Sequence, residues 1–196
     1  MAAPAKKLAT YFDLEAVPPH LVAEIINGSL ETHSCSIQHS HALTQLIYHL
    51  IGPFERGRDG PGGWNFLPKT ELHIGGDLLV PDLAGWRRER LPSLPDAAFM
   101  ELAPDWVGEI VSPATTRLNR GAKRTIYAEI GVAFLWVIDP QERVLEAFLL
   151  TRGNWRLESV AVASEFVKLP PFDAATFSLD ILFEFDPPSR APTPQG

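Results

Sequence analysis

The chain has 196 residues, of which 45% are apolar, and it carries a formal net charge of -7. These values predict one globular domain over residues 1–185 and argue against a protein that coats nucleic acid through a broadly basic surface. The only cysteine, Cys35, excludes an internal disulfide, and the longest apolar run, residues 132–138, is far shorter than the ~20 residues that cross a bilayer. We therefore expect a cytoplasmic protein that does not span a membrane.

Helix and strand signals alternate in the first 74 residues. Residues 14–27 predict a short helix, because Pro18 and Pro19 suit its first turn and Asn27-Gly28 can end it. The other elements expected here are a strand, a helix with an apolar stripe and two strands that pair with each other: residues 29–36, 38–52, 64–67 and 70–74.

Cys35, His39 and His41 lie close together near the start of the second predicted helix. Thiolates and imidazoles bind zinc, but a structural zinc site takes four ligands, and no fourth ligand is suitably spaced. We therefore interpret the two histidines as surface or helix-capping residues.

Two short apolar runs each contain one carboxylate. The first closes with Pro81-Asp82, and the second, residues 106–111, carries Glu109 between apolar neighbours. Alternation along a strand places Glu109 and Val111 on the same face of the sheet. Ligand sites gather at strand ends in α/β proteins, and a divalent cation removes the repulsion between two ionised carboxylates. The pair therefore predicts a Mg²⁺ or Mn²⁺ site, unless both acids simply face solvent.

A helix predicted between Pro113 and Gly131 supplies positive charge. Asn119, Lys123 and Tyr127 are spaced four residues apart, so they form one stripe along this helix. Three arginines add cations near the stripe: Arg117, Arg120 and Arg124. The pattern fits a solvated basic face, and it equally fits a helix that directs Lys123 at the two acids and offers arginines to a polyanion.

Strand signals dominate the chain beyond this helix. The expected elements are a buried strand, a hairpin, an edge strand and a short final helix: residues 133–138, 143–150 with 155–162, 166–169 and 178–183. Residues 186–196 contain four prolines and predict a disordered tail.

Several stretches, taken in their order and spacing, resemble a known family. They are residues 22–30, 80–83, 104–113, Lys123 with Tyr127, 131–132 and 136–140. Over about residues 12–183 the chain resembles the Uma-type restriction-endonuclease-like proteins, a bacterial family in the PD-(D/E)XK nuclease superfamily. The resemblance implies an α/β fold with a mixed central sheet flanked by helices, and a metal-dependent phosphodiesterase.

The resemblance also implies roles for individual residues. Asp82 would be the first metal-binding acid and Glu109 the second. The superfamily commonly carries a lysine two residues after the second acid, where this chain has Val111. The family places that lysine on the following helix, which is Lys123 here.

Three more positions belong to this match. Glu24 corresponds to a further acid near the start of the family pattern, and Tyr127 follows Lys123 by one helical turn. Asn119 stands where the family commonly has an aspartate. Lys123 is the only lysine between positions 69 and 168, so we expect no other lysine from this core segment in the site.

These observations lead to one preferred function. We expect an endonuclease in which a divalent metal acidifies a bound water while Lys123 stabilises charge on the phosphate. The three arginines would contact the nucleic acid, expected to be DNA, and double-strand cutting by analogy favours a homodimer.

Two other readings stay open. The chain could be a catalytically degenerate module that binds nucleic acid or a protein partner, which the missing acid at Asn119 favours. It could also be a glycoside hydrolase that uses the same pair of acids.

Overall fold

A six-stranded mixed sheet forms the centre of the molecule. The computed structural model describes residues 8–112 and 118–185. In sheet order the strands are β10 (Asn154–Val162), β9 (Val144–Thr151), β8 (Phe134–Asp139), β7 (Trp106–Ile110), β6 (Leu83–Arg87) and β3 (Trp64–Pro68). Strands β7 and β8 run parallel, whereas every other neighbouring pair is antiparallel. The expected mixed sheet is confirmed, and so are its buried strand at 133–138 and its hairpin at 143–162.

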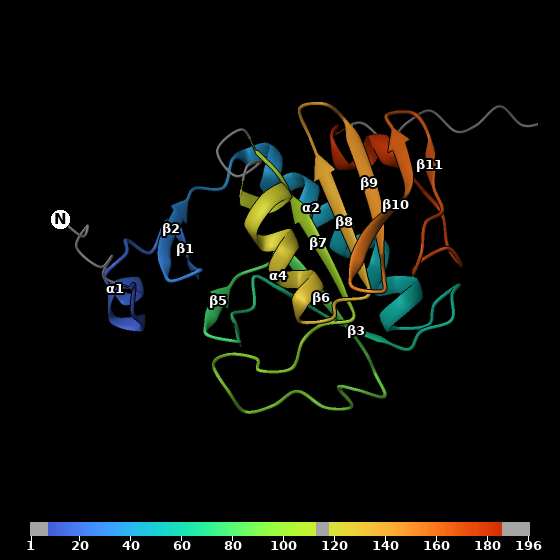
Figure 1. Ribbon diagram of the computed structural model, residues 1–196. Helices are drawn as coiled ribbons and strands as arrows, with labels where there is room; N and C mark the ends of the chain where they lie inside the picture. The colour runs from blue at the N-terminus through green and yellow to red at the C-terminus, as the bar shows by residue number, and fades with distance from the viewer. Residues whose placement is uncertain (1–7, 113–117, 186–196) are drawn as a thin grey trace, which may run out of the picture.

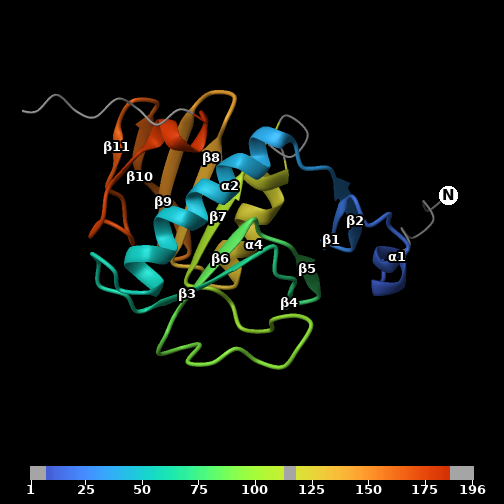
Figure 2. The same cartoon turned by 180° about the vertical axis from the view of Figure 1, so that it is seen from behind.

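Helices cover both faces of this sheet, as Figures 1 and 2 show from opposite sides. Helix α2 (Ile37–Leu50) lies on one face, and α4 (Arg124–Glu129) lies on the other. Apolar residues of α2 share a core cluster with Trp106 and Ile110, while those of α4 share a second cluster with Val107 and Val111. The predicted alternation along this strand is therefore confirmed, and Glu109 lies on the face that α4 covers.

A second, four-stranded sheet lies beside the first and holds the N-terminal strands (Figure 1). Its order is β2 (Ser29–His33), β1 (Val22–Ile26), β5 (Asp77–Leu79) and β4 (Leu72–Ile74). The chain leaves this sheet after β5 and enters the large sheet at β6, so Val80, Pro81 and Asp82 bridge the two sheets. Asp82 thus directly precedes a strand of the large sheet, instead of ending a strand as expected.

Residues 14–27 do not form the expected helix. A short helix, α1 (Tyr11–Glu15), is followed by β1, which forms a hairpin with β2. Asn27 and Gly28 connect these strands with φ values of 51° and 70°, the left-handed conformation of a type I′ turn. Asn-Gly favours such a hairpin as well as a helix end, and the β-branched residues before it favour the strand.

The strands predicted at 64–67 and 70–74 do not pair with each other. Strand β3 pairs with β6, and β4 pairs with β5 through a Gly75-Gly76 turn. Glycine at both turn positions permits the positive φ values that close a two-residue hairpin. Local sequence patterns do not reveal the β3–β6 pairing, because it joins segments separated by the whole β4–β5 hairpin.

Several shorter elements differ in type from the prediction. One π-helical turn, Ile51–Glu55, extends α2, and a second, Asn119–Lys123, precedes α4. The final helix is a 3₁₀ turn, Leu179–Leu182, and β11 (Phe166–Val167) pairs with β12 (Phe177–Ser178) in a separate ladder. The π turn before α4 matters for the site, because its residues do not repeat at the spacing of an α-helix.

Some expectations concern parts of the chain that the structure does not describe. The tail at 186–196 and the predicted start of the helix after Pro113 both fall outside the described residues. Within residues 8–112 and 118–185, no helix is long and apolar enough to cross a membrane. The extent of the domain, residues 1–185, stays a prediction.

Gly108 in β7 gives a direct test of packing between the sheet and α2. A Cβ atom at this position would lie 2.7 Å from the buried ring of Trp106. We expect Gly108→Ala to lower the free energy of unfolding by about 1–3 kcal/mol, because the ring has no room to move. Urea unfolding followed by fluorescence measures this change.

Gly52 provides the matched control, since a Cβ atom there would meet nothing within 4 Å. Gly52→Ala should change stability by less than about 1 kcal/mol. Equal effects of the two substitutions would contradict the packing at Gly108.

Candidate active site

The two predicted acids lie opposite each other on adjacent strands. In the antiparallel pairing of β6 with β7, Leu83 faces Gly108, and extending this register by one residue places Asp82 opposite Glu109. Both residues are buried, with exposed fractions of 2% and 1%. A buried carboxylate is costly without charged or hydrogen-bonding partners, so the neighbours of each acid decide its chemistry.

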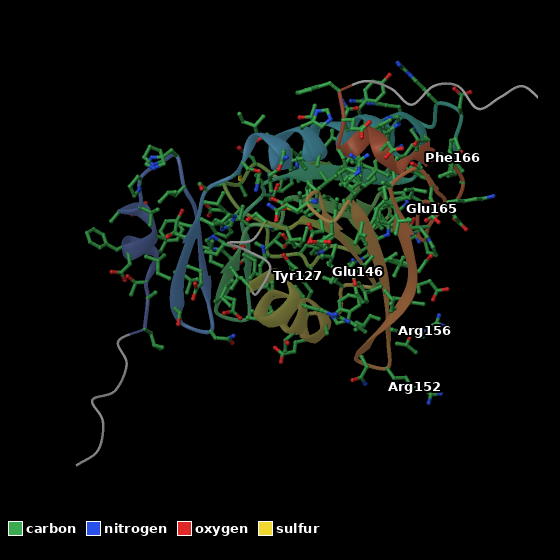
Figure 3. The ribbon with its side chains drawn as sticks, turned by 90° about the horizontal axis from the view of Figure 1, so that it is seen from above. Tyr127, Glu146, Arg152, Arg156, Glu165 and Phe166 are labelled. Atoms are coloured by element: carbon green, nitrogen blue, oxygen red, sulfur yellow. The ribbon has the colours of Figure 1, made fainter. Side chains whose placement is uncertain are left out.

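Lys123 and Tyr127 contact Glu109 from the helical segment that covers this face. Lys123 Nζ lies 2.7 Å from Glu109 Oε1, and the Tyr127 hydroxyl donates to the same oxygen at 2.6 Å. Both side chains are buried, and Tyr127 lies on the side of α4 that faces the sheet (Figure 3). The predicted stripe is therefore confirmed for these two residues, and so is the close approach of the Lys123 amine to Glu109.

Glu24 adds a third carboxylate from the smaller sheet. Its Oε1 accepts a hydrogen bond from the Val80 N–H at 2.6 Å and lies 2.9 Å from Lys123 Nζ. Glu24 is fully buried, and its Oε2 has no hydrogen-bond partner among the described residues. Buried polar atoms are rarely left without a partner, so this oxygen is a candidate ligand for a cation.

Protein groups bind both oxygens of the Asp82 carboxylate. Oδ2 accepts a hydrogen bond from the Ile110 N–H at 2.6 Å, and Oδ1 lies 2.9 Å from His39 Nε2. Lys69 Nζ forms a hydrogen-bonded ion pair with the same Oδ1. Asp82 therefore joins β3, β7 and α2 at the junction of the two sheets.

His39 and Lys69 both contact Asp82, and neither was predicted as a site residue. His39, which we interpreted as a surface or capping residue, is buried against Asp82 from the first turn of α2. In the β3–β6 pairing Pro68 faces Leu83, so the next pair in register is Lys69 with Asp82. A sequence analysis that had predicted the pairing of β3 with β6 would have placed Lys69 opposite Asp82. Lys69 lies just outside the segment in which Lys123 is the only lysine, so it was not considered as a site residue.

Of the possible zinc ligands, Cys35 and His39 form a hydrogen bond with each other, but His41 contacts a different part of the chain. His41 Nε2 lies 3.2 Å from the carbonyl oxygen of Ile181, whereas His39 contacts Asp82. In the described part of the chain, no three Cys, His, Asp or Glu side chains form a metal site by themselves. The histidine cluster therefore gives the zinc hypothesis no support.

The surroundings shift the pKa values of the two acids in opposite directions. Burial alone would raise the pKa of Asp82, but His39 and the two lysines hold it well below its ordinary value. Burial raises the pKa of Glu109 to about 7, with Asp82 and Glu24 adding to the shift against the attraction of Lys123. Asp82 is therefore ionised at neutral pH, whereas Glu109 holds a proton more readily than an ordinary glutamate does.

Lys123 and His39 both keep a positive charge at neutral pH. Burial would lower the pKa of Lys123, but the carboxylates of Glu109, Glu24 and Asp82 outweigh it and hold the pKa above the ordinary value. Burial would also lower the pKa of His39, but the hydrogen bond with Asp82 raises it to about 9. Lys123 is consequently suited to stabilising negative charge and not to accepting a proton.

The donor atoms at this site fit magnesium or manganese. Both ions prefer oxygen ligands, and Mg²⁺ is usually held by one or two carboxylates while water and substrate oxygens complete its coordination. Asp82 and Glu109 would supply the carboxylates, and the unpaired Glu24 Oε2 is a further oxygen in the same cluster. A divalent cation would also offset the repulsion that helps to raise the pKa of Glu109.

The predicted nucleic-acid contacts are only partly described. Arg124 stacks its guanidinium over the Phe148 ring, 4.0 Å from the centroid, so part of its surface packs on the sheet. Arg117 and the side chains of Asn119 and Arg120 lie outside the described part. The π turn between Asn119 and Lys123 means that the assumed helical stripe does not extend unchanged to Asn119.

The shifted pKa values of Glu109 and His39 favour a loss of stability in the metal-free protein as pH rises. Glu109 binds its proton more tightly in the folded state, so its contribution falls between its ordinary pKa of 4.5 and about 7. The contribution of His39 is fully present below 6.5 and is lost as pH rises through about 9. These two groups should therefore lower the free energy of unfolding, measured with urea in a chelator, from pH 5 to pH 9, against the opposite contributions of His33 and His49, whose pKa values burial lowers.

Two substitutions separate these contributions. Glu109→Gln should remove the decrease below pH 7, whereas His39→Gln should remove the decrease above it. Identical pH profiles for the wild type and Glu109→Gln would show that Glu109 titrates as an ordinary carboxylate.

Comparisons with known proteins agree on one kind of fold. The family model Uma2, described as "Putative restriction endonuclease", matches residues 8–181. A solved structure from Anabaena variabilis, described as a "putative nuclease belonging to DUF820", aligns with a TM-score of 0.71 and 19% sequence identity. The alignment covers 89% of this chain and 97% of that chain. No curated protein gives a significant match.

The structural likeness shows that the two proteins share one fold. The family match is the more specific finding, since it extends over most of the chain. It includes the positions of Glu24, Asp82, Glu109 and Lys123, which the structure brings together. This chain therefore belongs to the Uma2 family.

Proposed function

We propose that this protein is a divalent-metal-dependent endonuclease that hydrolyses phosphodiester bonds in DNA. The observation that carries the proposal is the buried cluster in which Asp82 and Glu109 face each other and Lys123 contacts Glu109 at 2.7 Å. Membership of a family described as restriction endonucleases supports a nuclease function and favours DNA as the substrate. A nuclease of this kind needs carboxylates that can hold a metal and a fixed positive charge, and the acids and Lys123 of this cluster are consistent with both roles.

Each residue of the cluster has a distinct part in this proposal. Asp82 and Glu109 would hold Mg²⁺ or Mn²⁺, which supplies Lewis acidity at a phosphate oxygen and lowers the pKa of water. Lys123, whose pKa stays above its ordinary value, would face the phosphate as an ammonium and stabilise its developing charge. Tyr127 donates to Glu109 Oε1 and so positions that carboxylate.

The remaining parts of the proposal concern partners and setting. Arg117, Arg120 and Arg124 would contact DNA phosphates near the cluster, which carries no broad positive charge of its own. Cleavage of both strands by one site per chain would need two copies, which supports a homodimer. The exposed thiol of Cys35 suits a reducing cytoplasm.

The metal site is tested first by binding. We expect Mn²⁺ to bind the wild type, and Asp82→Ala or Glu109→Ala to weaken binding by about 100-fold or more, because each removes a proposed ligand. Isothermal titration calorimetry measures both affinities. Asp96→Ala, which removes an exposed loop acid, is the control and should bind like the wild type. Unchanged binding in both site variants would exclude the two-acid site.

The role of Lys123 is tested by cleavage. Lys123→Arg keeps the positive charge that the buried carboxylates need, but its planar guanidinium does not reproduce a compact ammonium. We expect this variant to fold and to cleave supercoiled plasmid about 10²–10³-fold more slowly in Mg²⁺ or Mn²⁺. Lys168→Arg, an exposed position, should cleave at the wild-type rate.

Two outcomes would count against the proposal in different ways. A wild-type rate for Lys123→Arg would remove Lys123 from the mechanism. Binding of DNA without cleavage under any divalent metal would instead favour the degenerate binding module.

A further inference from the structure

Lys69 is a second lysine at Asp82, and its geometry differs from that of Lys123. Its amine forms an ion pair with Asp82 Oδ1, while its backbone N–H donates to the Asp82 carbonyl at 3.2 Å. Lys69 also has a φ of 50°, a left-handed conformation that few residues other than glycine adopt. Both ends of this residue are therefore held at Asp82, at the turn that follows β3.

One oxygen of the Asp82 carboxylate, Oδ1, has both of its acceptor positions taken while Lys69 is in place. Oδ2 is bound by the Ile110 N–H, and Oδ1 is shared by His39 and Lys69. A carboxylate oxygen accepts about two strong interactions, one for each lone pair. A metal ion that uses Oδ1 must consequently take the place of one of its present partners.

The solvent exposure of each side chain indicates which partner of Asp82 Oδ1 a metal ion can displace. The Lys69 side chain is 29% exposed, whereas the His39 side chain is 6% exposed and that of Lys123 is 1% exposed. A lysine at the surface can move its ammonium into water at small cost, because its flexible chain allows many conformations and the charge regains its hydration. His39 would have to leave the core, and Lys123 would leave two buried carboxylates without a cation.

We propose that Lys69 occupies the metal position at Asp82 in the metal-free protein and is displaced when a divalent cation binds. This inference rests on the proposed function, because the cation is the one assigned to Asp82 and Glu109. The exchange replaces a single positive charge on Oδ1 with a double one and leaves the Lys69 ammonium in solvent. In the metal-free protein Lys69 therefore balances the negative charge of Asp82. Because it competes for the same oxygen, it also lowers the affinity of the site for the metal.

Mn²⁺ titration of Lys69→Met tests the effect on affinity. Removal of the competing amine should tighten Mn²⁺ binding by about tenfold, the effect expected for one charge-assisted hydrogen bond. Lys168→Met removes an exposed lysine elsewhere and should bind Mn²⁺ like the wild type. Lys69→Gln serves as a second variant if the methionine substitution unfolds the chain, which thermal melting will reveal.

Chemical labelling of the wild type tests the displacement itself. Acetic anhydride modifies exposed amines, and mass spectrometry of the peptides gives the rate at each lysine. Saturating Mn²⁺ should increase the rate at Lys69 several-fold and leave that at Lys168 unchanged. A change in electrostatic potential alone would tighten binding in Lys69→Met without exposing Lys69 in the wild type, so this measurement distinguishes the two causes.

The possible failures are distinguishable. Mn²⁺ binding with no increase in Lys69 labelling, or equal affinity in the wild type and Lys69→Met, would overturn the displacement and leave the metal site intact. Absence of Mn²⁺ binding in both proteins would overturn the displacement together with the metal-dependent function.

Discussion

The site depends on the charge compensation of Asp82, a buried carboxylate at the point where the chain passes from one sheet to the other. Its two oxygens contact Ile110 of β7, His39 of α2 and Lys69 after β3. Without these partners an ionised carboxylate would be too costly to bury. The packing of β7, of α2 and of the turn after β3 is therefore mutually dependent. The interaction therefore couples the register of three strands to the position of a helix.

The cluster beyond Asp82 is a balance of like and unlike charges. Glu24 and Glu109 both contact the buried ammonium of Lys123, and repulsion from Asp82 and Glu24 helps to raise the pKa of Glu109. Such an arrangement contributes less to stability than apolar packing of the same volume would. It does keep three carboxylates buried in one small region, at a cost that the proposed cation site would explain. The two lysines of the cluster differ in exposure, since Lys123 is buried in the core and Lys69 is partly exposed to solvent.

The sequence allowed the two acids and Lys123 to be predicted, because each has a local signal. Glu109 interrupts an apolar strand, Asp82 follows an apolar run, and Lys123 shares helical spacing with Tyr127. Local patterns were less reliable where one signal supports two structures. Asn27-Gly28 ends a helix or closes a hairpin equally well, and only the pairing of β1 with β2 and β5 selects the hairpin. The π turn before α4 was likewise invisible in a pattern that assumed α-helical spacing.

The sequence by itself determined where most of the strands lie, the two faces of β7 and the chemical types of the central residues, while the mixed sheet was implied by the family resemblance. These properties follow from the alternation and spacing of neighbouring side chains, which the chain carries locally. Only the tertiary structure decided that β3 pairs with β6, that Lys69 lies opposite Asp82 and that His39 points into the core. These contacts join segments far apart in the chain, and Asp82 meets His39 and Lys69 only once the sheets and α2 have packed.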